Sequence, residues 1–239
     1  MPQQRLIEHI RFRAGFLSIF LNRNHIMRKV IQDAAKDFAE EEAFSVLDFG
    51  CGTKPYRHLF KNTVSYTGVD FQNDQIPRPA RDVDVYYDGV NLPFDDNSFD
   101  LVISFEVLEH IPNLEPILME ISRVIKPGGK FFITTPFLYP EHETPFDYQR
   151  LTIYRWVNLL EEMGYKVEAY SREPNDIRSL MQLNLSLIFK FINPKDSYAL
   201  ETIFSPIIMI FNVLAYIFGL LFRRHGGFHL TNILKARKI

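Results

Sequence analysis

Two aspartates and two glycines have the residue types and spacing needed to bind a nucleoside. An apolar segment that begins at Val46 ends at Asp48, and Gly50 and Gly52 follow one residue apart. Such a run predicts a buried parallel strand, after which glycines let the backbone approach a ligand closely. Twenty residues after Gly50, a second short segment ends at Asp70. A carboxylate at this position can accept hydrogen bonds from both hydroxyls of a ribose.

The residues after these glycines narrow the choice of nucleoside. A dinucleotide-binding turn follows the pattern G-x-G-x-x-G, but here Lys54 is followed by Pro55 at the position of the third glycine. The phosphate-binding pattern G-x-x-x-x-G-K-[ST] does not occur in the sequence. The shorter D-x-G-x-G turn suits a ligand that lacks a pyrophosphate and whose amino-acid portion lies along the loop. S-adenosylmethionine (SAM) is such a ligand.

Three further segments extend this pattern. They are Asp88–Phe94, Ser98–His110 and Arg123–Gly129, in that order along the chain. Together with the glycine turn, they resemble the class I SAM-dependent methyltransferase family over roughly residues 44–170. The resemblance implies an α/β, Rossmann-like class I methyltransferase fold, with a mostly parallel sheet and helices on both faces. It also implies S-adenosyl-L-methionine as the cofactor.

The same resemblance gives individual residues roles around SAM. Asp48 would organise the glycine turn through backbone hydrogen bonds, and Gly50 and Gly52 would lie beside the methionine portion. Asp70 would accept the ribose hydroxyls. The remaining positions would contact the adenine (Asp88 and Gly89) or line the methyl end of the cofactor (Phe105 and Glu106).

His142 is a candidate catalytic base, which a hydroxyl acceptor requires. It lies in the segment 136–150, which resembles the P-x-H-x-x-P-x-D-x-x-R signature of a bacterial subgroup linked to cell-surface saccharide biosynthesis. We expect this segment to follow a strand and to cover the acceptor pocket. Asp147 and Arg150 of the signature have an alternative role, which is to pair with each other and brace the loop.

His110 is the second candidate base, with a structural role as the alternative. It lies four residues after Glu106, so the two side chains share a face if this turn is helical. The seven histidines show no ligand spacing and the carboxylates are dispersed. We therefore assign no metal, and we expect SAM to bind without a divalent ion.

The composition restricts the class of protein. The 239 residues suffice for one sizeable α/β domain with an addition. A net charge of −2 argues against a nucleic-acid partner. The single cysteine, Cys51, fits a reducing compartment. Charged residues interrupt the apolar residues near the N-terminus, so we expect no cleavable signal and a cytoplasmic location.

The order of the expected elements is that of an alternating α/β protein. Helices are expected over 7–39, over 114–125 with a stop at Pro127–Gly129, and over 152–163. Strands are expected near 45–49, 65–69, 83–87, 100–105, 130–135, 165–170 and 228–239. We divide the chain into an N-terminal helical cover (1–40), a SAM-binding core (41–175), an apolar helical insertion (176–226) and the final strand of the core sheet (227–239).

The apolar insertion departs from a minimal domain of this type. Residues 203–222 carry no charge and precede Arg223 and Arg224, a pattern typical of membrane-spanning helices. A single crossing would separate the final strand from its sheet, so we expect no true span. Two interpretations remain for the stretches 180–192 and 203–222. They form either a helical pair packed on the protein or on a dimer partner, or a hairpin in the membrane surface.

These observations lead to one main hypothesis and two alternatives. The main hypothesis is methyl transfer from SAM to a small-molecule, sugar or lipid-linked acceptor, at oxygen. The first alternative is N- or C-methylation of a quinone-like small molecule, and the second is a non-catalytic partner protein that keeps the fold. We expect a small-molecule, glycan or lipid-linked substrate and no nucleic acid. Peripheral contact with the inner face of the membrane and a homodimer are the two expected uses of the insertion.

Overall fold

The computed structural model describes residues 14–39, 45–72, 82–193, 197–222 and 227–239. The described residues form two compact units. The first, called the helical unit, comprises those within 1–34, 138–140 and 172–231. The second, called the sheet unit, comprises those within 35–137, 141–171 and 232–239. The four ranges predicted from the sequence divide the chain by role, and that division stays a prediction.

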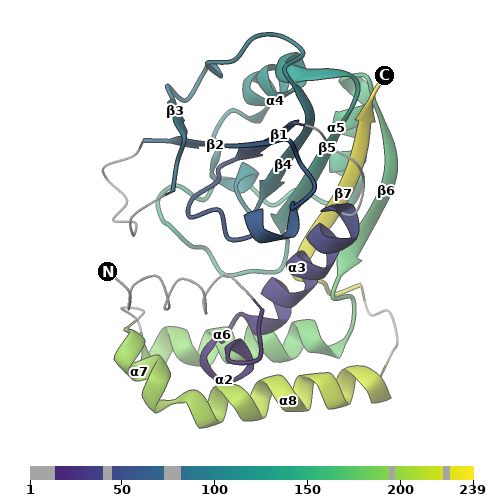
Figure 1. The fold of residues 1–239 in the computed structure, drawn as a ribbon. Coiled ribbons are helices and arrows are strands. Elements are labelled where there is room, and N and C mark those ends of the chain that lie inside the picture. The colour runs from purple at the N-terminus through teal and green to yellow at the C-terminus, as the bar shows by residue number, and fades with distance from the viewer. Residues whose placement is uncertain (1–13, 40–44, 73–81, 194–196, 223–226) are drawn as a thin grey trace. The chain divides into compact units, whose positions relative to one another are not determined.

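The described residues form a sheet of seven strands in the order β3-β2-β1-β4-β5-β7-β6. The pairs β1–β2, β1–β4, β2–β3 and β4–β5 are parallel. This mostly parallel, Rossmann-like sheet confirms the predicted fold class (Figure 1). The strands are β1 (Ser45–Phe49), β2 (Ser65–Phe71), β3 (Val85–Tyr87), β4 (Phe99–Phe105), β5 (Ile125–Pro136), β6 (Tyr165–Glu173) and β7 (Thr231–Lys238).

The strand order reverses between β1 and β4, and this reversal positions the candidate site. From β1 the chain proceeds through β2 to β3 in one direction, whereas β4 lies on the other side of β1. In open parallel sheets, ligands bind at the carboxyl ends of the strands where the order reverses. The glycine turn follows β1, Asp70 lies at the end of β2, and Glu106 follows β4. All three therefore belong to the same edge of the sheet.

Helices cover both faces of the sheet. The apolar sides of α4 (Leu114–Val124) and α5 (Ile153–Glu162) share one core with Phe131 and Ile133 of β5. Successive strand residues point to opposite faces, so Phe132 faces the other way. On that face its ring stacks on Phe38, near the end of α3 (His25–Ala39), with ring centroids 4.6 Å apart.

The end of α4 differs from the sequence expectation. Pro127–Gly129 was expected to stop the helix, but α4 ends at Val124 and β5 begins at Ile125. Ile125 already has extended backbone angles, with φ −77° and ψ 131°. A register shift between β4 and β5 accommodates the Pro-Gly-Gly residues inside the strand. The expectation was wrong because the sheet takes up the chain before the helix-breaking residues are reached.

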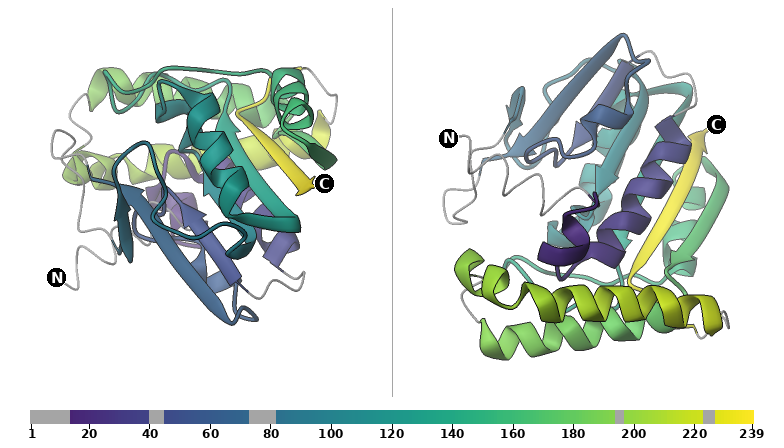
Figure 2. Two further views of the ribbon diagram at one scale, coloured as in Figure 1. Left: turned by 90° about the horizontal axis from the view of Figure 1, so that it is seen from above. Right: turned by 60° about the horizontal axis from the view of Figure 1, so that its bottom comes forward.

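The helical unit contains the predicted apolar insertion, which lies between β6 and β7 as expected. The helices of the insertion are α6 (Ile177–Ile192), α7 (Tyr198–Ile203) and α8 (Ser205–Leu221). The helical unit also contains α2 (Ser18–Leu21). Helices α6 and α8 run side by side in all three views of Figures 1 and 2 and enclose Leu185, Phe189 and Ile208. The first part of the predicted N-terminal helix, residues 7–13, lies outside the described residues.

Polar residues of this apolar segment connect it to α2 and α3. The Asn212 amide donates to the Ile19 carbonyl at 2.8 Å and to the Asn22 carbonyl at 3.2 Å. The Tyr216 hydroxyl lies 3.1 Å from Nε2 of His25. The two Asn212 bonds explain why this polar residue lies in a mostly apolar helix.

Within the described part of the insertion, the expected pair of helices is instead a set of three. Phe204 has φ −87° and ψ 8° and separates α7 from α8. Pro206 then occupies the first turn of α8, where a missing N–H has no cost and the fixed φ favours a new helix. The expected continuous helix over 203–222 was therefore wrong at its start. Across the described parts of the chain, no helix has both the length and the hydropathy needed to cross a bilayer.

Candidate functional site

The glycine turn after β1 is tied to the tip of β2. The amides of Gly50 and Cys51 donate to the Val69 carbonyl at 2.9 and 3.1 Å. The Gly52 amide donates to Oδ2 of Asp70 at 2.9 Å. Both glycines have positive φ, 72° at Gly50 and 51° at Gly52, which favours glycine at these positions. The turn and the ribose-binding candidate are therefore parts of one hydrogen-bonded structure.

The two glycines have different surroundings. A Cβ added to Gly50 would lie 2.9 Å from Cβ of Val107 and nearer still to its methyl groups. A Cβ added to Gly52 would have no atom within 4 Å among the described residues. Gly50 is thus required by the protein's own packing, whereas Gly52 borders open space. That open space beside a carboxylate fits the predicted position of the methionine portion of SAM.

Asp48 does not hold the glycine turn as expected. It is buried, and its Oδ2 accepts a hydrogen bond of 2.6 Å from the Tyr66 hydroxyl. Burial raises the pKa of Asp48 to about 7, although the Tyr66 hydrogen bond acts in the opposite direction. The turn is held by Val69 and Asp70 instead. The sequence could not indicate this, because Tyr66 reaches Asp48 only through the pairing of β1 with β2.

A buried lysine lies beside the turn, at a position that the sequence marks only as a departure from the usual glycine pattern. Lys54 is 2% exposed, has φ 49° and places its Nζ 2.7 Å from Oδ2 of Asp84. The same oxygen accepts from the Gly68 amide at 2.7 Å. A Cβ at Gly68 would collide with the Lys54 side chain. A glycine inside a strand often marks such a close approach, so Gly68 was the available signal.

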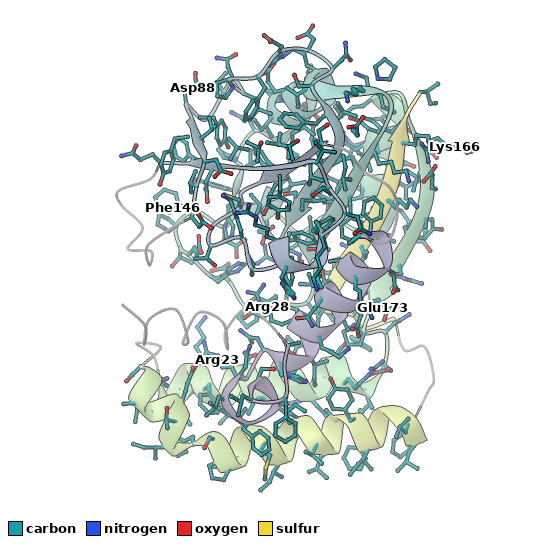
Figure 3. All side chains as sticks on the ribbon, viewed as in Figure 1. Arg23, Arg28, Asp88, Phe146, Lys166 and Glu173 are labelled. Carbon is teal, nitrogen blue, oxygen red and sulfur yellow. The ribbon has the colours of Figure 1, made fainter. Side chains whose placement is uncertain are left out.

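Asp88 and Gly89 lie on the loop that follows β3, and Figure 3 labels Asp88 at the outer edge of the sheet unit. Oδ1 of Asp88 accepts from the amides of Val90 at 2.8 Å and Asn91 at 2.6 Å. These hydrogen bonds hold the pKa of the Asp88 carboxyl below its usual range. Gly89 has φ 90°. The adenine contact assigned to this pair stays a prediction.

Phe105 ends β4 and Glu106 follows it, at the same edge of the sheet. The Phe105 ring lies 4.6 Å from that of Tyr56 and 5.7 Å from that of Phe132, centroid to centroid, so it packs within the protein. Glu106 has φ 54°, and its amide donates to the Thr134 carbonyl at 3.0 Å. Their predicted place at the methyl end of the cofactor stays a prediction.

The expected helical face shared by Glu106 and His110 is not formed. Val107 has φ −132° and ψ −40°, and the 3₁₀ helix η2 (Leu108–His110) begins only after it. Glu106 with its positive φ lies outside any helix. The strand end and the close contact of Val107 with Gly50 determine this conformation, which the four-residue spacing could not reveal.

The structure brings the two candidate bases together. The rings of His110 and His142 lie 4.7 Å apart, centroid to centroid. Nδ1 of His110 lies 2.8 Å from the Phe146 carbonyl oxygen (Phe146 is labelled in Figure 3). Nδ1 of His142 lies 3.2 Å from Oδ2 of Asp147. Arg150 forms an ion pair with Asp147 through its two terminal guanidinium nitrogens, so the predicted pairing of these residues is observed.

Glu109, which lies between the two histidines, is a site residue that the sequence pattern did not reveal. Its side chain is 1% exposed, and its Oε1 lies 3.6 Å from Nε2 of His110 and 3.7 Å from Nε2 of His142. Burial, with the nearby Glu106, raises the pKa of Glu109 well above its usual range. Burial, followed by the nearby His110, lowers the pKa of His142 to about 4. The neighbouring residues Glu109 and His110 were a signal for a polar cluster in the sequence. Only the fold shows that His142 belongs to the same cluster.

Comparison with known proteins agrees with this geometry. Residues 47–133 match the methyltransferase domain family. The solved structure of the [4+2]-cyclase SpnF superimposes with a TM-score of 0.57 at 20% identity, covering 88% of this chain and 81% of that chain. At this identity the likeness concerns the fold. The comparisons therefore show that residues 47–133 are similar to a methyltransferase domain and that the chain has a Rossmann-like methyltransferase fold.

Curated relatives match part of the chain. Sterol 24-C-methyltransferase ERG6B of Gibberella zeae is 36% identical over 109 residues, which are 41% of this chain and 29% of the relative. The 27-O-demethylrifamycin SV methyltransferase of Amycolatopsis mediterranei is 33% identical over 107 residues, 40% of this chain and 39% of the relative. The chain thus spans less than half of the length of either relative.

Proposed function

We propose that this protein transfers a methyl group from SAM to an oxygen of a small-molecule, sugar or lipid-linked acceptor. The observation that carries the proposal is the glycine turn joined to Asp70, with open space at Gly52. SAM supplies an electrophilic methyl group on a sulfonium, so the protein has to bind, align and exclude water. The matched methyltransferase domain supports the same reaction class.

The acceptor's proton is assigned to His142. Its side chain is 30% exposed, and the lowered pKa keeps the imidazole neutral near pH 7. Asp147 orients the ring through Nδ1, which leaves Nε2 to accept a proton. His110, whose Nδ1 faces a backbone carbonyl, is the second candidate base.

Two alternatives remain. A sterol 24-C-methyltransferase and a 27-O-demethylrifamycin methyltransferase both match, and their names indicate different acceptor atoms. Methylation of carbon or nitrogen on a quinone-like ring would not require a base that removes a proton from a hydroxyl. A non-catalytic partner protein would not need an intact turn, so the Gly52–Asp70 hydrogen bond argues against it.

Replacing Asp70 with alanine is expected to weaken SAM binding about 10- to 150-fold. The carboxylate would accept the ribose hydroxyls, and a hydrogen bond to a charged group contributes roughly 1.5–3 kcal/mol. It also holds the Gly52 amide of the turn. Isothermal calorimetry with SAM measures the affinity. Labelled SAM incubated with fractionated cell-envelope extract then shows which fraction gains methyl groups.

The matched control is Asp95→Ala. Asp95 is exposed and lies shortly before β4, at the edge of the sheet opposite the glycine turn. Its replacement should leave SAM affinity within about twofold, which is near the limit of surface effects. Equal affinity in the Asp70 variant and the parent would refute the SAM site. Tight SAM binding with no methylated fraction would instead favour the non-catalytic alternative.

The insertion is proposed to contact the cytoplasmic face of a membrane. Helix α8 carries an exposed apolar stripe at helical spacing, and no residue of this helix is charged. A helix with such a stripe can lie in the membrane surface with its apolar side inserted. A homodimer interface is the alternative use of the same stripe. Its residues are Ile207, Ile210, Leu214, Ile217 and Leu221.

The double variant Ile210→Glu, Ile217→Glu is expected to abolish pelleting with anionic vesicles. Each charge would have to enter the apolar layer, which costs several kcal/mol. Vesicle sedimentation measures the association, and calorimetry with SAM checks that the domain still folds. The matched control, Val64→Glu, Met119→Glu, places the same charges at exposed apolar positions of the sheet unit and should still pellet. A parent protein that never pellets would rule out membrane contact.

A further inference from the structure

The Glu109 carboxylate is a buried polar group that the proposed methyl transfer does not use. Among the described residues, neither of its oxygens has a hydrogen-bond partner. A buried carboxylate without partners is costly, and such a group in a folded protein needs an explanation. Two ring nitrogens lie near Oε1, the Nε2 atoms of His110 and His142, at 3.6 and 3.7 Å. Those distances are too long for hydrogen bonds.

The hydrogen bond at Nδ1 of His110 determines whether its Nε2 carries a proton. The Phe146 carbonyl oxygen, 2.8 Å from Nδ1, can only accept, so Nδ1 carries the proton. In the neutral ring Nε2 is then an unprotonated nitrogen with a lone pair. This lone pair lies on the side of Glu109.

His142 has the same arrangement through a side chain. Oδ2 of Asp147 lies 3.2 Å from Nδ1, whereas Nη2 of Arg150 is farther, at 3.5 Å. Asp147, which Arg150 holds by two contacts, is the nearer group, and its negative charge favours a proton on Nδ1. In that tautomer, Nε2 of His142 is also an unprotonated nitrogen near the Glu109 carboxyl group.

Two ring nitrogens and one carboxyl group thus converge, and each can donate an electron pair to a cation once Glu109 loses its proton. The ligand atoms of Glu109, His110 and His142 all lie within 4.8 Å of one another. In a metal site with bonds of about 2.0–2.2 Å, neighbouring ligand atoms are about 3–3.5 Å apart. A small contraction of the cluster would reach that spacing. A proton on Glu109 could form a hydrogen bond with only one of the two histidines. A cation could bind Glu109 and both histidines at once.

We propose that Glu109, His110 and His142 bind a divalent transition metal of the zinc type. Two imidazole nitrogens and one carboxylate are a known ligand set for catalytic zinc, with a position left open for water or a substrate oxygen. Magnesium and calcium prefer oxygen ligands, so they fit this set poorly. Phe146 and Asp147 orient the histidines in the way that outer hydrogen bonds orient metal ligands.

The proposed metal is separate from SAM binding, for which no metal is expected. It uses the Nε2 lone pair of His142, so a loaded site and a proton-accepting His142 exclude each other. The role of His142 as base therefore belongs to the metal-free protein. An acceptor oxygen would instead bind at the open position of the metal. The inference does not depend on methyl transfer, because its test is a metal spectrum.

Titration of the metal-free full chain, without an affinity tag, with Co²⁺ tests the proposal. We expect one equivalent of Co²⁺ to produce the strong visible absorption of a low-coordinate site, Zn²⁺ to remove it and Mg²⁺ to leave it unchanged. Glu109→Gln keeps the size of the side chain but removes the charge, and His142→Gln removes one nitrogen ligand. Each should weaken Co²⁺ binding by at least tenfold, because even outer-shell changes cost about 10- to 100-fold.

His58→Gln is the matched control, since His58 lies outside the cluster and bonds the Pro55 carbonyl. It should bind Co²⁺ as the parent does. His142 is partly exposed, so its variant should fold even if the Glu109 variant does not. Only the weak absorption of hydrated Co²⁺ in the parent, or parent-like binding in His142→Gln, would refute the metal site. The first result would indicate that a proton on Glu109 occupies the cluster.

Discussion

Alanine at position 142 is expected to lower methyl-transfer turnover about a hundredfold or more, with SAM affinity nearly unchanged. A positioned base typically contributes at least this factor to the rate. His142 lies in the segment 136–150, outside the glycine turn that would hold SAM. The assay measures turnover with labelled SAM and contains a chelator, so that only the metal-free protein is observed. Calorimetry measures SAM affinity separately.

Two variants separate loss of the base from disturbance of the loop. Glu141→Ala changes an adjacent exposed side chain and should retain turnover. Asp147→Asn keeps the loop side chain but weakens the orientation of the His142 ring, so it should lower turnover less than His142→Ala. Turnover within a few-fold of the parent in His142→Ala would exclude this base and make His110 the next candidate.

The pH profile provides a further measure of the same base. A histidine with its pKa lowered to about 4 stays neutral at pH values where one with the ordinary value of 6.5 is protonated. The proton-accepting form is therefore present above about pH 4 and is lost as the pH falls through that value. The acid limb of turnover should lie well below pH 6.5.

Gly50→Ala is expected to lower the free energy of unfolding by about 2–5 kcal/mol. A non-glycine residue at positive φ costs roughly 1–2 kcal/mol, and overpacking adds about 1–3 kcal/mol. The overpacking arises because the new Cβ would collide with Val107. Urea denaturation measures the loss. The companion Gly52→Ala should lose only about 1–2 kcal/mol, because its Cβ enters open space.

The collision has its own test in a double-mutant cycle. Val107→Ala removes the methyl groups that a Cβ at Gly50 would meet. The double variant should therefore lose less free energy of unfolding than the two single variants lose in sum, by about 1–3 kcal/mol. Simple additivity would mean that the backbone moves to relieve the contact. For SAM binding the order should reverse, since Gly52→Ala places a methyl group where the ligand is proposed to lie.

The sheet and its turn could be predicted from the sequence because their signals are local. Buried parallel strands give short apolar runs, and the residues at their carboxyl ends reach one edge by topology alone. The spacing along the chain therefore suffices to place Gly50, Gly52 and Asp70 together, as the hydrogen bond between the last two confirms. The three-helix form of the insertion depended on Phe204 and Pro206, whose local effect the apolar pattern concealed.

The rest of the site could not be predicted because it depends on contacts between distant segments. Lys54 meets Asp84 across a glycine of β2. Glu109 meets His142 only because η2 and the segment 136–150 lie against each other. Neither pair has a characteristic spacing along the chain. Buried charges of this kind become visible only when their partners are placed in space.

The short segment from Glu106 to His110 has a consequence for the order in which ligands bind. At one end Val107 contacts the glycine turn, and at the other the Glu109 carbonyl accepts from the Tyr148 amide at 2.9 Å. One short peptide thus joins the glycine turn to the segment 136–150. If SAM shifts this peptide, acceptor affinity changes, and thermodynamic linkage requires the acceptor to change SAM affinity by the same factor. The two binding steps are then one cooperative unit rather than independent events.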